Sequence, residues 1–143
     1  LSRARPRLIT SGAEVEVGTS GGISRDGTLA ALGGAALIGL AAAGFHFVRG
    51  NSIPAALGLL IIAALSGLAG SLVDSLMGAT VQAIYFCDLC GKETERFPMH
   101  KCGKPTRYFR GWRWLDNDWV NFLSSVVGAA LAAGLWYALA LTR

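Results

Sequence analysis

Three long stretches with almost no charge constrain this chain more than any other feature of its sequence. Residues 27–48 form an uncharged run of 22 residues. At 1.5 Å per residue this run makes about 33 Å of helix, enough to cross the hydrocarbon core of a bilayer. Residues 53–77, which carry one charge at Asp74, and residues 120–141 are two further apolar stretches of similar length. The sequence therefore predicts an all-α membrane protein with three transmembrane helices.

The distribution of positive charge predicts how these helices are oriented. Two polar segments, residues 1–26 and 83–119, hold eleven of the thirteen Lys and Arg residues, whereas Arg49 and Arg143 flank the other ends of the helices. Three spans put both polar segments on one side, and the positive-inside rule makes that side cytoplasmic. We expect a prokaryotic plasma membrane and a lipid bilayer as the immediate partner, and we do not expect nucleic acid as a partner.

The N-terminal segment does not have the pattern of a signal peptide. The chain begins with Leu1, and residues 1–9 contain three arginines but no apolar core. We expect residues 1–143 to be a single membrane domain, the C-terminal part of a longer chain whose N-terminal spans are missing. The sequence leaves the oligomeric state open.

Three cysteines and a histidine in the polar segment 83–119 have the spacing of metal ligands. Cys87 and Cys90 are separated by two residues in a Cys-x-x-Cys pair, and His100 and Cys102 follow as a second pair with an unusual spacing. One histidine and three thiolates suit Zn²⁺ in a closed tetrahedral site. We expect a structural zinc that folds a small zinc-knuckle-like cytoplasmic loop lacking a core of its own. The alternative is a redox role for the Cys-x-x-Cys pair.

Asp74 is an acidic residue near the end of the second apolar stretch. At helical spacing it shares a stripe with Gly70, Gly78 and Gln82. Ionisable residues in membrane helices usually face a protein interior or an aqueous cavity, and they are functional by default. We therefore expect Asp74 to be catalytic. The alternative is a helix-end charge in the headgroup region, with the glycines serving only close helix packing.

A loop rich in glycine and hydroxyl groups precedes the first apolar stretch and is a candidate phosphate-binding site. Backbone N–H groups and hydroxyls in such a loop can bind a phosphate, aided by the dipole of the helix that follows. No Gly-Lys-Ser/Thr follows, so this is not a Walker A loop. The alternative is a plain connector. The candidate residues are Gly18, Thr19, Ser20, Gly21, Gly22 and Ser24.

Carboxylates and amides also cluster where the third apolar stretch begins. The candidate catalytic residues are Asp116, Asn117, Asp118 and Asn121. Asp116 fits the N-cap position of a helix. Oxygen ligands of this kind suit Mg²⁺, which commonly bridges protein carboxylates and substrate phosphates. The alternative is a capping cluster at the membrane interface.

These three polar sets share the predicted cytoplasmic interface. Basic residues surround them at Lys104, Arg107, Arg110 and Arg113. Such a site suits an amphiphile whose phosphate lies at the membrane surface and whose tail lies in the lipid. Phosphoryl transfer to such a substrate needs mainly positioning and charge neutralisation by metal ions and cations.

Five motifs in order resemble one known family over nearly the whole chain. The motifs are Pro6–Thr10, Gly18–Ser24, Gly70–Gly78, Cys87–Gly103 and Trp114–Asn121. Together they resemble the transmembrane protein 19 family, also called domain-of-unknown-function family 92. Members are multi-span membrane proteins, and the characterised plant and cyanobacterial relatives are phytyl-phosphate kinases that make phytyl diphosphate for tocopherol synthesis.

The resemblance implies a nucleotide-dependent kinase that converts a prenyl, phytyl-type monophosphate to the diphosphate. It implies Mg²⁺ with a nucleoside triphosphate, and it carries over onto the glycine loop, Asp74 and the 116–121 cluster. Family members also have upstream spans and an acidic motif just before the region of Pro6–Thr10, so we expect this piece to lack part of the active site. Two other classes stay open: a membrane carrier or transport module, and a scaffold whose cysteine-rich loop docks a partner.

Overall fold

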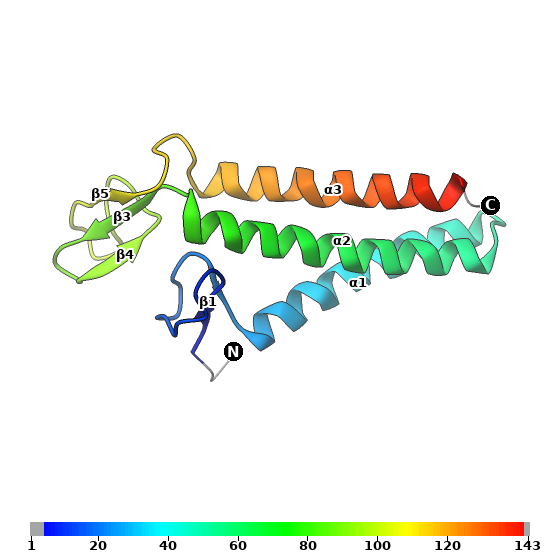
Figure 1. Ribbon diagram of the computed structural model, residues 1–143, viewed down its shortest axis with the longest axis horizontal. Helices are drawn as coiled ribbons and strands as arrows, with labels where there is room; N and C mark the ends of the chain where they lie inside the picture. The colour runs from blue at the N-terminus through cyan, green and yellow to red at the C-terminus, as the bar shows by residue number, and fades with distance from the viewer. Residues whose placement is uncertain (1–4, 142–143) are drawn as a thin grey trace. The chain divides into compact units, whose positions relative to one another are not determined.

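A computed structural model describes residues 5–141 of the chain (Figure 1). Arg3 and Arg143, two of the cations counted in the charge balance, lie outside the described residues. The chain divides into two compact units. The polar unit combines the segment up to Ser24 with Val73–Leu123, and the helical unit combines Arg25–Leu72 with the segment from Ser124 onwards.

Three long helices account for most of the chain. They are α1, Arg25–Val48; α2, Ile53–Thr80; and α3, Asn117–Leu141 (Figure 1). Each is long and apolar enough to cross a membrane, which confirms the three predicted transmembrane helices. Large apolar side chains on them, such as Ile38 and Phe45, are more than two-thirds exposed in the isolated chain. This surface suits lipid or further helices.

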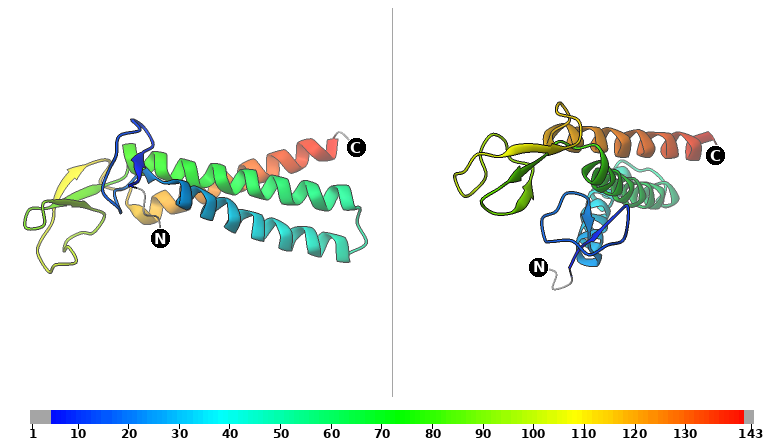
Figure 2. Two further views of the ribbon diagram at one scale, coloured as in Figure 1. Left: turned by 90° about the horizontal axis from the view of Figure 1, so that it is seen from below. Right: turned by 60° about the vertical axis from the view of Figure 1, so that its left-hand side comes forward.

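Small residues allow close approach in the helical unit. Figure 2 shows α1 lying alongside α2. A Cβ atom at Gly39 of α1 would lie 3.0 Å from the Leu60 backbone, and one at Gly67 of α2 would lie 2.5 Å from the Cβ of Ala35. A Cβ at Gly128 of α3 would lie 3.2 Å from a backbone oxygen of α2. Glycines at helix contacts therefore let backbones approach, as is common among membrane helices.

The polar unit contains five short strands. They are β1, Arg7–Leu8; β2, Gly22–Ile23; β3, Ile84–Cys87; β4, Lys92–Thr94; and β5, Arg107–Arg110. β1 pairs with β2, and the other three form an antiparallel sheet in the order β4-β3-β5. From the sequence we expected residues 83–119 to form a loop, and we did not predict this small sheet.

A small core joins the end of α2 to the start of α3 within the polar unit. Its side chains are at most 1% exposed, and they are Ala83, Ile84, Cys87, Leu115 and Val120. Backbone hydrogen bonds reinforce it, from Ala83 N to Leu115 O at 2.7 Å and from Trp112 N to Val81 O at 2.8 Å. The residues after α2 and before α3 are therefore fixed to each other.

Replacing Gly39 by leucine should destabilise the helical unit. The new side chain would begin 3.0 Å from the Leu60 backbone, and overpacking of this kind typically costs about 1–3 kcal/mol. We expect a lower midpoint of thermal unfolding, followed by circular dichroism in detergent. Gly34→Leu is the matched control, because nothing lies within 4 Å of a Cβ at Gly34. Equal midpoints for the two variants would contradict the packing described here.

Candidate functional site

Four side chains that could hold a metal ion lie together in the polar unit. Cys87 ends β3, Cys90 lies in the turn after it, and His100 and Cys102 come from the segment between β4 and β5. Their ligand atoms all lie within 4.8 Å of one another. These are the four residues that the sequence predicted, and the group could hold a metal ion.

Two tight turns bring these ligands together. Gly91 donates its N–H to the carbonyl of Cys87 at 2.9 Å, and Gly103 donates to the carbonyl of His100 at 2.9 Å. Both glycines have positive φ, +62° and +77°, which only glycine adopts readily. The second turn explains the unusual His-x-Cys spacing, because it folds His100 and Cys102 to the same side.

The sulfur atoms are close but not bonded. Cys87 Sγ and Cys102 Sγ are 3.6 Å apart, whereas a disulfide bond measures about 2.05 Å. His100 Nδ1 lies 3.2 Å from Cys102 Sγ, and this hydrogen bond lowers the pKa of Cys102 to about 6. Hydrogen bonding with Cys102, and then burial, raise the pKa of Cys90 to about 11. Ionisation of Cys102 therefore disfavours ionisation of Cys90. A bound cation would offset this repulsion between thiolates, so the donor set suits a cation.

The glycine loop packs on the C-terminal end of α2. Gly21 has a φ of +82°, and a Cβ there would lie 2.4 Å from the Cβ of Ala79. Gly78 faces the same loop, because a Cβ at Gly78 would lie 3.0 Å from the Gly21 nitrogen. Within the loop, the N–H of Gly22 donates to the Thr19 carbonyl at 3.0 Å. The loop is thus a fitted backbone contact, and phosphate binding by it stays a prediction.

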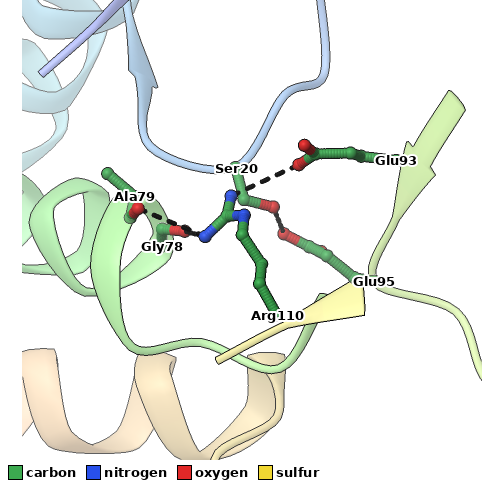
Figure 3. Close-up of polar contacts among 6 residues, drawn as sticks. All are labelled: Ser20, Gly78, Ala79, Glu93, Glu95 and Arg110. Carbon is green, nitrogen blue, oxygen red and sulfur yellow. Dashed lines mark hydrogen bonds and ion pairs between the residues drawn. The ribbon is translucent and has the colours of Figure 1, made fainter. Parts of the chain in front are cut away.

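Arg110 anchors β5 to the end of the same helix. Its Nη1 donates to the carbonyls of Gly78 and Ala79 at 3.3 and 3.2 Å, and its Nη2 lies 3.3 Å from a carboxylate oxygen of Glu93 (Figure 3). In the same view, the Ser20 hydroxyl donates to Glu95 at 2.5 Å. A guanidinium group satisfies helix C-terminal carbonyls and complements the helix dipole. The basic residue that we expected near the phosphate site therefore has a structural role at the helix end.

Two of the other basic residues expected around the site also have partners in the polar unit. Arg107 forms an ion pair with Asp88 at 3.0 Å. The Arg113 guanidinium lies 4.7 Å from the ring centroid of Tyr108. The side chains of Arg107 and Arg113 are therefore already engaged.

Asp74 is half-buried on α2, one turn before Gly78. Gln82, one turn after Gly78, is 2% exposed, and its Nε2 has no hydrogen-bond partner among the described residues. The backbone of Gly111 packs against Gln82 with a positive φ of +90°. The predicted stripe, which runs from Gly70 to Gln82, therefore ends where the C-terminal end of α2 is closely packed. A catalytic role for Asp74 stays a prediction.

One member of the acidic cluster, Asp116, caps the start of α3. Asp116 Oδ1 accepts hydrogen bonds from the backbone N–H groups of Asp118 and Trp119, both at 3.1 Å. Asn121 Nδ2 donates to the carbonyl of Asn117 at 2.9 Å. The predicted N-cap is confirmed. One Asp116 oxygen is thereby engaged, so metal binding in this cluster, which stays a prediction, falls chiefly on Asp118.

Comparison with known proteins shows which family this chain belongs to. Three helices long and apolar enough to cross a membrane are typical of an integral membrane protein, and a family described as "Integral membrane protein DUF92" matches residues 1–129. The chain belongs to this family. It is 38% identical over 137 residues to "Protein PGR" of Arabidopsis thaliana, covering 93% of this chain and 46% of that protein.

A second relative is archaeal. The chain is 43% identical over 79 residues to "Uncharacterized membrane protein MJ0933" of Methanocaldococcus jannaschii, covering 55% of this chain and 30% of that protein. The chain thus spans less than half the length of either of these curated relatives. No solved structure matches it.

Sequence reasoning missed the acidic residues that join the N-terminal segment to the sheet. Glu95 pairs with Ser20, and Glu16 forms an ion pair with Lys92 at 2.7 Å. These partners are far apart in the sequence. No local pattern in the sequence indicates these contacts. Lys92 alone drew notice, because it directly follows the Cys90-Gly91 turn.

Removing the Arg110 side chain should destabilise the polar unit. Arg110→Met leaves two α2 carbonyls and Glu93 without a charged donor, and hydrogen bonds to a charged group contribute about 1.5–3 kcal/mol. We expect the midpoint of denaturant unfolding, followed by tryptophan fluorescence, to fall by the equivalent of about 1–3 kcal/mol. Arg107→Met is the matched control, since its ion pair with Asp88 is exposed and contributes about 0–1 kcal/mol. A larger loss in the control would refute the anchoring role of Arg110.

Proposed function

We propose that this chain is part of a membrane-embedded kinase that converts a prenyl monophosphate to the diphosphate. The observation that carries the proposal is the composition of the polar unit. It combines the glycine loop, the Asp74 end of α2 and the carboxylate-capped start of α3. The family resemblance supports the same activity. Because apolar helices lead into these residues, the prenyl tail would lie in lipid while its phosphate meets the polar unit.

The reaction joins two anions, so charge neutralisation is its main requirement. A phosphate oxygen of the prenyl monophosphate attacks the terminal phosphorus of the nucleoside triphosphate. The bond from that phosphorus to the bridging oxygen breaks, and the products are the prenyl diphosphate and the nucleoside diphosphate. Mg²⁺, when bound, neutralises charge on the transferring phosphoryl group.

Named residues of this chain would hold the reactants. Asp74 and Asp118 offer carboxylate oxygens for Mg²⁺, and Asn117 and Asn121 supplement them with amide oxygens. Asp116 keeps the start of α3 in place through its cap. The loop Gly18–Ser24 would receive phosphate from the cytoplasmic side, where the positive-inside rule puts both basic segments.

We also propose that the Cys₃His group holds a structural Zn²⁺. Sulfurs at the corners of a zinc tetrahedron with bonds of about 2.3 Å lie roughly 3.7 Å apart, and the observed 3.6 Å between Cys87 Sγ and Cys102 Sγ fits this spacing. All four positions of a closed site would be filled by protein. The ion would then stabilise the β3–β5 sheet without taking part in the reaction.

Substitution of Asp74 tests the proposed kinase activity. In the full-length protein, given phytyl or geranylgeranyl monophosphate and a panel of nucleoside triphosphates, Asp74→Asn should lower kcat at least about a hundredfold, as expected for loss of a charged group that binds the catalytic metal. Asp26→Asn, a control on the exposed first turn of α1, should keep full activity.

Full activity of Asp74→Asn would refute the assigned role. Absence of a diphosphate product from the wild-type protein would refute the kinase itself. Ion or lipid flux in proteoliposomes without nucleotide would then favour a carrier.

Substitution of Cys90 tests the proposed zinc site. Cys90→Ser should lower the zinc content, measured by mass spectrometry of the purified protein, from about one ion per chain to a small fraction of that, because a closed site loses a ligand. Asp88→Asn, in the same turn but outside the ligand set, should retain the ion. An unchanged zinc content in Cys90→Ser would rule out this site.

A further inference from the structure

An open groove lies within the polar unit, apart from the metal ligands. It runs between the segment Val15–Thr19 and the β3–β4 hairpin, and its volume is about 380 Å³. Phe86 and Lys92 line the hairpin side. This volume is in the range of small-molecule sites, which begins at about 300 Å³. The sequence did not predict a site here.

The lining combines apolar walls with one lysine and two carboxylates, and the second carboxylate, that of Glu93, is paired with Arg110 at 3.3 Å. Val15, Val17 and Phe86 supply apolar surface. Lys92 Nζ lies 2.7 Å from a carboxylate oxygen of Glu16. Such a lining suits a ligand with a flat apolar part, hydroxyl groups and an anionic group. A nucleoside triphosphate has all three, as its base, its ribose and its phosphates.

The ion pair in the groove is open to exchange. The side chains of Lys92 and Glu16 are 57% and 69% exposed, and exposed pairs contribute little to stability. A ligand with both hydroxyl and phosphate groups can replace this contact with two stronger, charge-assisted hydrogen bonds.

The groove continues into the glycine loop. Gly18 and Thr19 line the groove and begin that loop. Gly18 has a φ of +92°, and nothing lies within 4 Å of a Cβ at this position. The backbone there is open to a ligand, whereas Gly21, three residues later, is packed against Ala79.

We propose that this groove binds the nucleoside end of the nucleoside triphosphate, with Glu16 accepting hydrogen bonds from the ribose hydroxyls and Lys92 binding a phosphate. Carboxylates bind ribose hydroxyls in the same way in dinucleotide-binding folds. The base lies against Phe86 and the valines, and the remaining phosphates extend along Gly18 and Thr19. This inference rests on the kinase proposed above, and it adds the nucleotide subsite that the sequence motifs did not include.

Nucleotide binding to the full-length protein in nanodiscs, without prenyl acceptor, tests the groove. ATP, GTP, CTP and UTP are titrated calorimetrically with Mg²⁺, and the tightest binder is carried forward. Lys92→Met and Glu16→Gln should each weaken its binding at least tenfold. Val17→Trp should do the same by filling the groove. Val17 is 83% exposed, so the fold has room for the larger side chain, and the replacement leaves the charges unchanged.

Ribose recognition provides a sharper readout. The 2′,3′-dideoxy form of the same nucleotide should bind the wild-type protein at least tenfold more weakly than the parent. Glu16→Gln should bind the two forms with affinities that differ less than threefold. Glu14→Gln is the matched control, since Glu14 forms an exposed ion pair with Arg7 outside the groove. Arg49→Met controls for loss of an exposed cation outside the polar unit, and unchanged zinc content in Lys92→Met confirms that the metal cluster is intact.

The outcomes separate this inference from the kinase itself. Wild-type affinity in Lys92→Met, Glu16→Gln and Val17→Trp, with kinase activity present, overturns the groove and leaves the kinase standing. Wild-type protein that binds no nucleotide and makes no diphosphate overturns both. Weakened nucleotide binding with unchanged affinity for geranylgeranyl phosphate supports the groove as a nucleotide subsite.

Discussion

The guanidinium group of Arg110 on the last carbonyls of α2 is the contact on which the polar unit depends. A helix ends with backbone carbonyls that lack intrahelical partners, and here Gly78 and Ala79 receive theirs from β5. The same side chain reaches Glu93 on β4, so one residue ties the helix to two strands. Gly21 packs on the same turn. The end of α2 therefore organises the loop and the sheet at once.

This anchoring matters because the polar unit has little apolar core. Its fully buried large side chains are few, among them Ile84, Leu115 and Val120, and small domains with so little core usually need disulfides or metals. No disulfide joins its three cysteines. A metal held by the Cys₃His group would supply folding free energy in the manner of zinc fingers. Helix anchor and glycine contact thus act together where hydrophobic burial is limited, and a bound metal would add to them.

The sequence predicted what local pattern determines and missed what distant residues determine. The lengths of the apolar stretches gave the three helices, the ligand spacing gave the metal group, and the position of Asp116 gave the cap of α3. The strands escaped prediction because they have two to four residues each, too few for an alternating pattern to be recognised. The role of Arg110 and the Glu16–Lys92 groove escaped because each joins residues far apart in the chain, and no periodicity reports such pairs.

The four residues of the Cys₃His group differ in exposure, and this sets which of them a reagent in solution reaches first. Cys87 is buried at the end of β3, Cys90 is half-buried, and Cys102 is exposed. A chelator or oxidant meets the His100–Cys102 arm first, while Cys87 is shielded by the sheet. Loss of a bound ion would therefore proceed from the surface inwards, with the arm between β4 and β5 opening before the Cys87–Cys90 turn.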